Sequence, residues 1–202
     1  MLTIDGGGLA GGAVVTNVAA FTIGYFAGNN ELIATNGGRL YSAAGSAVGN
    51  NSSNNAVGIF SNALWNLGGA ALTNGSGGAT GNVITVDGGI LTNINTLAIG
   101  GGLGANHNSL IVTNGGQLFG ANAITFNTNG YGNTIVMGGG FWNLTNNPFA
   151  IGTGPNSSNN TLTVSGGVVS NINAGVSIGV TNGANFNSLI VTSGGRLMAV
   201  ES

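Results

Sequence analysis

One asparagine recurs along this chain at a nearly constant interval, and that interval constrains the fold more than any other feature. Its successive occurrences are separated by 25, 27, 26, 25, 27 and 27 residues. Repeats of this length are typical of a solenoid, in which each repeat forms one coil and neighbouring coils share a continuous core. The seven anchor positions are Asn30, Asn55, Asn82, Asn108, Asn133, Asn160 and Asn187.

A short alternating segment follows each anchor, as in residues 83–86, 109–112 and 161–164. A turn comes next, usually Gly-Gly, and then a second apolar segment whose last residues are Ile23, Val48, Leu72, Ile99, Phe126, Ile151 and Ile178. One coil of this kind cannot pair its backbone groups or bury enough apolar surface by itself, whereas coils stacked in register do both. The sequence therefore predicts an all-β fold, a single-stranded parallel β-helix (β-solenoid) of about eight coils of about 26 residues.

The anchor column predicts a structural asparagine ladder. Identical asparagines stacked along an axis can hydrogen-bond amide to amide from one layer to the next. The general preference of asparagine for turns accounts for many of the other asparagines in the chain. It does not explain why one column contains asparagine in every coil.

The sequence also repeats over a longer period of three coils, about 79 residues. Residues 109–118 return as 188–197, and Trp65-Asn66-Leu67 returns as Trp142-Asn143-Leu144. We expect one continuous solenoid over residues 1–202, without a second domain. Its three-coil blocks are residues 1–29 (partial), 30–107, 108–186 and 187–202 (partial).

Composition narrows the choice of partners. Charged residues make up 3% of the chain, and Arg39 and Arg196 are its only basic side chains apart from one histidine, which argues against nucleic-acid binding. A net charge of −2 provides little repulsion against self-association. No apolar run reaches the roughly 18 residues of a membrane span, and without cysteine no disulfide can form. The expected partners are another copy of the chain, stacked head to tail, or flanking solenoid repeats, because both ends are expected to expose strand edges.

The chemically reactive side chains are too few and too scattered to predict catalysis. Asp5 and Asp87 occupy one column but lie three coils apart, which is too far for the carboxylate pair of a glycoside hydrolase. His107 is the only histidine, and Phe186 takes its place in the next block. We therefore expect no catalytic residue, no cofactor and no metal site.

Trp65 and Trp142 have two interpretations. Their indole rings could stack on sugars, which would make carbohydrate a partner. Their recurrence in the three-coil repeat favours the alternative that they are structural residues of the solenoid wall.

The repeats resemble those of bacterial autotransporter passengers and related repeat-rich surface proteins with autotransporter-associated β-strand repeats. The resemblance rests on the Asn-x-Leu-x-Val-x-x-Gly-Gly segments, the Trp-Asn-Leu turns and the Gly-Ala-Asn-x-Asn corners. It implies a right-handed β-helix, secretion to the bacterial cell surface, and a structural or adhesive role. The first expectation is a structural surface element or fibre. The alternative is an adhesin that binds glycans or host surfaces through its corner loops, and a polysaccharide-active enzyme comes third.

Overall fold

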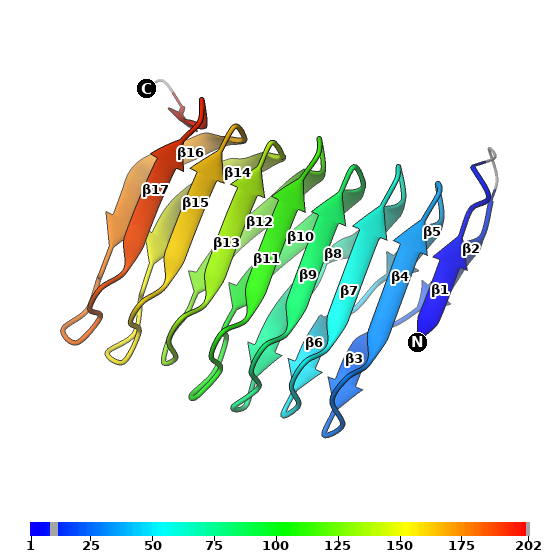
Figure 1. The fold of residues 1–202 in the computed structure, drawn as a ribbon, viewed down its shortest axis with the longest axis horizontal. Coiled ribbons are helices and arrows are strands. Elements are labelled where there is room, and N and C mark those ends of the chain that lie inside the picture. Colours follow the sequence, from blue (N-terminus) through cyan, green and yellow to red (C-terminus); the bar gives the residue numbers. More distant parts are fainter. Residues whose placement is uncertain (9–11, 201–202) are drawn as a thin grey trace.

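Stacked parallel strands, joined by turns and loops, make up the described part of the chain. The computed structural model describes residues 1–8 and 12–200, and none of these residues is helical. Successive coils follow one another along a single axis from the N-terminal to the C-terminal end (Figure 1). The predicted parallel β-solenoid is confirmed.

Each of eight coils contributes one strand to an eight-stranded parallel sheet, and the strands lie in the sheet in sequence order. These strands begin one residue after the anchor asparagine or its equivalent. They are β1 (Leu2–Asp5), β4 (Glu31–Thr35), β7 (Ala56–Phe60), β9 (Val83–Asp87), β11 (Ser109–Thr113), β13 (Thr134–Gly138), β15 (Thr161–Ser165) and β17 (Ser188–Thr192).

The rest of each coil belongs to a second parallel sheet, which bends partway along its strands. In the first two coils the two arms of the bend are separate strands, β2 (Val14–Val18) with β3 (Thr22–Tyr25) and β5 (Arg39–Ser42) with β6 (Ser46–Asn50). In later coils one strand spans both arms. These strands are β8 (Leu64–Ser76), β10 (Ile90–Ile99), β12 (Gln117–Phe126), β14 (Phe141–Ile151) and β16 (Val168–Ile178), and β18 (Arg196–Ala199) ends the sheet.

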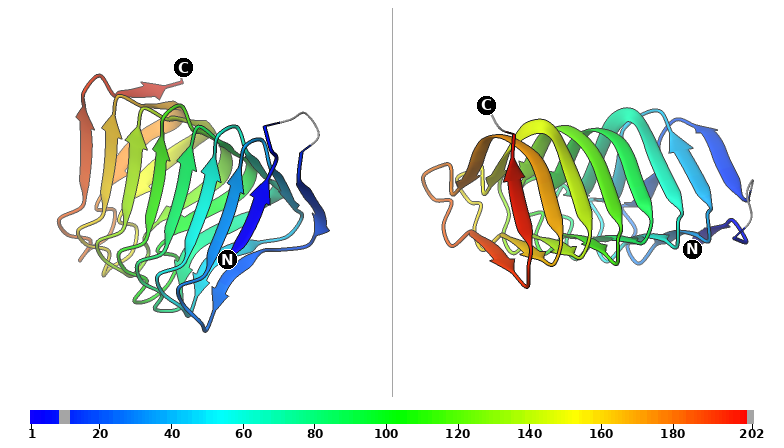
Figure 2. Two further views of the ribbon diagram at one scale, coloured as in Figure 1. Left: turned by 45° about the vertical axis from the view of Figure 1, so that its right-hand side comes forward. Right: turned by 90° about the horizontal axis from the view of Figure 1, so that it is seen from above.

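The solenoid is right-handed. In Figure 1 the eight-stranded sheet faces the viewer with its strands pointing up, the chain passes over the top to the fainter strands behind, and each coil lies farther from the N-terminal end. The two further views in Figure 2 show the same progression. The handedness implied by the resemblance is therefore present in the structure.

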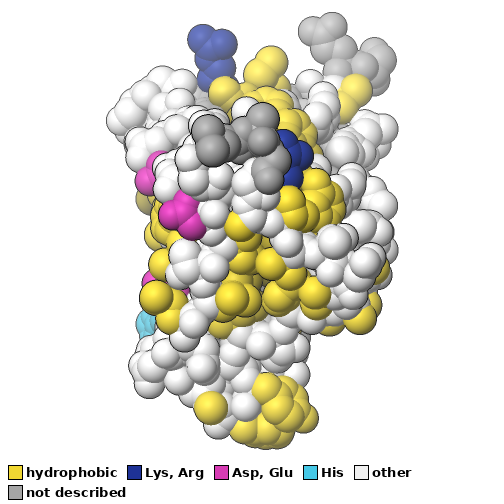
Figure 3. Space-filling view, turned by 90° about the vertical axis from the view of Figure 1, so that its right-hand side faces the viewer, with side chains coloured by type: hydrophobic (Ala, Val, Ile, Leu, Met, Phe, Trp, Pro, Cys, Tyr) yellow, Lys and Arg dark blue, Asp and Glu magenta, His cyan; other side chains and the backbone are white. Residues whose placement is uncertain are grey.

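The N-terminal end of the solenoid presents apolar side chains. In the space-filling view of this end, hydrophobic atoms gather in the middle of the face (Figure 3). Leu2 aligns with the buried Leu32 of the next coil but is itself 47% exposed. Its side chain belongs to a core column and has a neighbouring coil on one side only.

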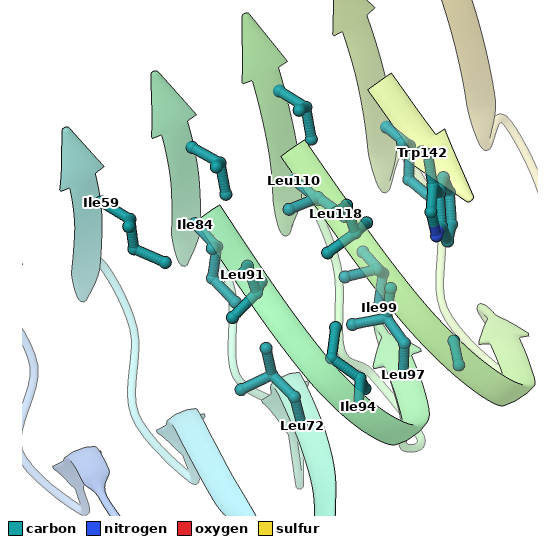
Figure 4. Close-up of a cluster of buried hydrophobic side chains, with 14 of the residues drawn as sticks. Ile59, Leu72, Ile84, Leu91, Ile94, Leu97, Ile99, Leu110, Leu118 and Trp142 are labelled. Carbon is teal, nitrogen blue, oxygen red and sulfur yellow. The ribbon is translucent and has the colours of Figure 1, made fainter. Parts of the chain in front are cut away.

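Alternation along each strand builds the core. Leu110 and Val112 on β11 are fully buried, whereas Ile111 between them is only partly buried. Figure 4 shows such side chains pointing from both sheets into the interior, in rows that run from coil to coil. The residue four places after each anchor is apolar in all seven coils. Six of these residues are 1% exposed or less, and the seventh, Val191, is 46% exposed in the last coil.

One residue of the second apolar column was assigned wrongly from the sequence. The structure aligns Val48 with Asn74 and Asn74 with Ile99, while Leu72 aligns with Ser46 and Leu97. Leu72 and Asn74 lie two residues apart on one strand, so both side chains point inward. The apolar pattern of the sequence assigned Leu72 to the column of Val48 and Ile99, but the residue in that column is the polar Asn74.

The two tryptophans lie inside the core, where each is fully buried. They are three coils apart and have different polar surroundings. The Trp65 indole Nε1–H donates to the Ser42 hydroxyl at 3.2 Å. The Trp142 Nε1–H has no hydrogen-bond partner, and its ring packs edge-on against Phe149 with centroids 5.6 Å apart.

This difference predicts unequal effects of the same substitution. Trp65→Phe removes a buried hydrogen bond and leaves the Ser42 hydroxyl without its partner, whereas Trp142→Phe removes a donor that has none. We expect W65F to lower the free energy of unfolding by about 1 kcal/mol more than W142F, the size of one buried hydrogen bond. Urea unfolding of the two variants side by side measures the difference, and equal losses would contradict the assignment.

Candidate functional site

The seven anchor asparagines form one continuous hydrogen-bonded row, which we call the asparagine ladder. From Asn30 to Asn160, the Nδ2 amide of each anchor donates to the Oδ1 of the anchor in the next coil. These six N···O distances run, in order, 3.0, 2.8, 2.9, 3.2, 3.4 and 2.8 Å. The ladder predicted from the sequence is therefore present.

The ladder also ties side chains to the backbone. The main-chain N–H of each of the same six asparagines donates to the same Oδ1 that accepts from its side chain, at 2.8 to 3.1 Å. In Asn82, Asn108 and Asn133 the second Nδ2 hydrogen reaches a corner carbonyl one coil back. Asn108 donates to Ala79 at 3.0 Å and Asn133 to Ala105 at 2.9 Å. An internal anchor such as Asn108 thus uses both lone pairs of its amide oxygen and both of its amide hydrogens.

Burial makes these bonds important for stability. The five internal anchors are 1% exposed or less, while Asn30 is exposed and Asn187 is half-buried. Buried amide groups without partners would cost free energy, so the internal anchors require their neighbours. In every bond between two anchors the donor belongs to the N-terminal anchor of the pair, which gives the ladder a direction along the axis.

A column of small residues makes room for the ladder. Gly75 has a φ of +81°, and a Cβ on it would lie 2.3 Å from the Asn108 Nδ2. Both the backbone conformation and the close approach therefore require glycine at this position. Gly24, Gly49, Gly100 and Gly152 contact the ladder in the same way.

Asn127 replaces glycine in this column and joins the ladder from the side. Its Nδ2 donates to the Oδ1 of Asn160 at 3.0 Å and also to the carbonyl of Gly130. Its own Oδ1 accepts from the Gly130 N–H at 2.7 Å. Sequence reasoning missed this contact. Gly follows the last residue of the second apolar segment in five of the seven coils, so Asn127 after Phe126 was a visible exception.

Asn74 is a second buried polar residue that sequence reasoning missed. It is fully buried, and its Nδ2 donates to the backbone carbonyl of Ser109 at 2.7 Å. Its Oδ1 has no partner. Asn74 thus connects β8 of the second sheet to β11 of the eight-stranded sheet, and it stands in a column that is otherwise apolar.

The sugar-stacking interpretation of Trp65 and Trp142 is wrong. Both side chains are 0% exposed, so neither indole face is available to a ligand. The structure places both tryptophans in the core, a structural role in accordance with the preferred interpretation.

The acidic side chains and His107 occupy separate positions along the solenoid, and Glu31 and His107 are chain neighbours of the anchors Asn30 and Asn108. Successive strand pairings place Asp5 and Asp87 in one column, three coils apart. The Gly7 backbone N–H and the Asn36 amide donate to Asp5 and hold its pKa below its usual value. His107 packs edge-on against Tyr131 at 4.9 Å. Within residues 1–8 and 12–200, no three His, Cys, Asp or Glu side chains are grouped as metal ligands would be.

Comparison with known proteins gave no relatives. The sequence matches no protein-family profile, no curated protein and no solved structure. The described residues include no helix long and apolar enough to cross a membrane.

Removing one internal anchor should destabilise the solenoid strongly. Asn108→Ala takes the acceptor from the Asn82 N–H and amide, leaves the Ala79 carbonyl without its donor, and removes one of the two donors to the Asn133 Oδ1. We expect a loss of about 3 kcal/mol or more, because each buried unsatisfied group costs about 1–3 kcal/mol. The matched control is Asn185→Ala, an exposed asparagine in a corner, which should change stability by less than about 0.5 kcal/mol. Equal urea midpoints for N108A and N185A would contradict a stabilising role.

An isosteric acid at the same position should make stability depend on pH. In N108D an oxygen replaces the Nδ2 and faces two acceptors, the Asn133 Oδ1 and the Ala79 carbonyl. Burial and these acceptors raise the pKa of the introduced carboxyl in the folded state. Because the folded protein then holds the proton more tightly, N108D should be most stable below the ordinary pKa of about 4 and lose stability as the pH rises. Thermal melting at several pH values checks this, with N185D as the exposed control. If the difference in melting temperature between N108D and N185D does not change with pH, the ladder geometry is contradicted.

Proposed function

We propose that this protein is a structural solenoid of the bacterial cell surface, working as a rigid rod segment rather than as an enzyme. In this proposal it stacks head to tail on copies of itself or on flanking solenoid coils. The observation that carries it is the asparagine ladder, which runs through seven coils with its donors in one direction. A rod in which every coil repeats the same polar and apolar columns can extend without changing its internal contacts.

The apolar N-terminal face supports stacking. A hollow of about 280 Å³ opens there, and its lining includes Leu2, Phe21 and Leu32. Leu2 and Leu32 stand in a core column, and Phe21 packs against the core. A further coil placed on this face, from another copy or from the same rod, would bury Leu2 and the half-buried Phe21 as such side chains are buried between internal coils.

The surface location and the absence of catalysis rest on sequence. The repeats resemble those of exported bacterial surface proteins, which supports an extracellular place. Asp5 and Asp87 are separated by three coils, and the remaining acid within the described residues, Glu31, begins β4 on the next coil after Asp5. This arrangement offers no carboxylate pair for polysaccharide hydrolysis.

A charge placed on the end face should block stacking, and a charge on the side wall should not. Leu2→Lys puts an ammonium into the apolar end column, where a stacked coil would have to bury it. Gln117→Lys is the matched control, because Gln117 is on the outer wall and aligns with Phe141 in a column that also contains Arg39 and Arg196. Negative-stain electron microscopy and light scattering should show rods of many lengths for wild type and Q117K, and single short particles for L2K.

Two outcomes would contradict this proposal. One is a wild-type chain that stays a single short particle at high concentration and also forms no part of longer rods in native material. The other is assembly of L2K to the same extent as Q117K. Circular dichroism of both variants confirms that the comparison is between folded proteins.

A further inference from the structure

A groove on the side wall lies where the second sheet bends. Its deeper part has a volume of about 330 Å³ and is lined mainly by residues of β10 and β12, with Gly69 of β8 and Thr145 of β14 at its edges. A second hollow of about 260 Å³ continues from it along β12 and β14, and Asn122 lines both. The two hollows therefore form one elongated depression across neighbouring coils.

The lengths of the bends explain the groove. From Trp65 to Leu72 on β8, and from Trp142 to Phe149 on β14, the chain needs seven residues to turn the corner. The equivalent segments on β10 and β12, from Leu91 to Leu97 and from Leu118 to Ile124, need six. Two shorter corners stand between two longer ones, so the surface is hollow over β10 and β12. The hollow thus follows from a one-residue difference in corner length between neighbouring coils.

Amide groups dominate the floor of the groove. Asn93, Asn95 and Asn122 are exposed there. The Asn122 Nδ2 donates to the Asn95 Oδ1 at 3.0 Å, and the Asn93 Nδ2 donates to Asn66 at 3.0 Å. These bonds hold the amides in place and leave the Asn95 Nδ2 as a donor and the Asn122 Oδ1 as an acceptor on the groove surface.

Apolar surface lies beside these amides. The half-buried Phe119 lines the deeper part and packs against Phe141 with ring centroids 5.8 Å apart, which fixes its ring. Ile124 and Pro148 line the second hollow. A ligand for this groove therefore needs hydroxyl or amide groups on its edges and C–H groups on its faces.

The other ligand classes fit less well. No lining residue of either hollow is charged, so the groove offers nothing to neutralise a phosphate, sulfate or carboxylate. An extended peptide would need a free strand edge, but β12 is paired with β10 on one side and β14 on the other. Sugars combine neutral vicinal hydroxyls with apolar C–H faces, and an elongated groove accommodates several of them in a row.

We propose that this groove binds a neutral oligosaccharide chain, with the Asn95 and Asn122 amides hydrogen-bonding its hydroxyls and Phe119 packing against a sugar face. The groove is on the side wall, so the proposal is independent of end-to-end stacking. It also places the glycan contact on the outer bend of the coils, away from the buried tryptophans.

The test uses the folded full chain and defined sugars. Cellohexaose, laminarihexaose and mannohexaose serve as neutral probes, and a heparin hexasaccharide and an alginate hexasaccharide serve as charged ones. Two-dimensional NMR of labelled wild-type protein at millimolar sugar should show shifts of the Asn95 and Asn122 side-chain amide signals with at least one neutral hexaose. This measurement needs no variant and does not depend on the stability of one.

A matched pair of variants then locates the contact. Asn95→Ala combined with Asn122→Ala should weaken binding of that hexaose about tenfold or more, the effect of losing one or two hydrogen bonds. Asn173 holds the position equivalent to Asn95 in the next three-coil block, is exposed and is outside the groove lining. Asn173→Ala should leave the affinity unchanged.

Three outcomes would overturn the proposal. They are the absence of amide shifts with every neutral hexaose, unchanged affinity in the N95A/N122A variant, and binding of the charged hexasaccharides alone. Failure here would leave the scaffold proposal untouched, because the two experiments examine different surfaces.

Discussion

Each coil of this protein depends on hydrogen bonds to the coils on either side. A strand of five residues has no partner within its own coil, so its N–H and C=O groups are satisfied only by the equivalent strands above and below it. The asparagine ladder adds a fixed starting point to this pairing. Because one Oδ1 accepts both the backbone and the side-chain N–H of the preceding anchor, neighbouring strands cannot slide without breaking two bonds at each step.

The choice of asparagine follows from this geometry. The site requires an acceptor that takes two bonds and a group that donates two, on a side chain short enough to remain beside its own backbone. An aspartate lacks the donors, and a serine offers only one. The glycine column has the same origin, since a Cβ on Gly75 would occupy the space of the Asn108 amide. The two columns are therefore one structural unit, which Asn127 modifies by adding a further amide in place of glycine.

The nearly uncharged surface and the regular core support a scaffold, while the three-coil repeat supplies variety on the outside. Internal columns change little from coil to coil, but the tryptophan positions follow the longer period. The same period that places Trp65 and Trp142 in the core also places long corners on both sides of the β10 and β12 bends.

The sequence by itself determined the coil length, the seven strands that follow the anchors and the ladder, because these depend on a repeat period and on strict alternation within short strands. It also located the columns of the core, except where Asn74 continued a column that the apolar pattern ended at Leu72. Only the tertiary structure decided how far each corner bulges, which indole has a partner and where the wall is hollow. Those features arise from differences of a single residue between neighbouring coils, and such differences have an effect only once the coils are stacked against one another.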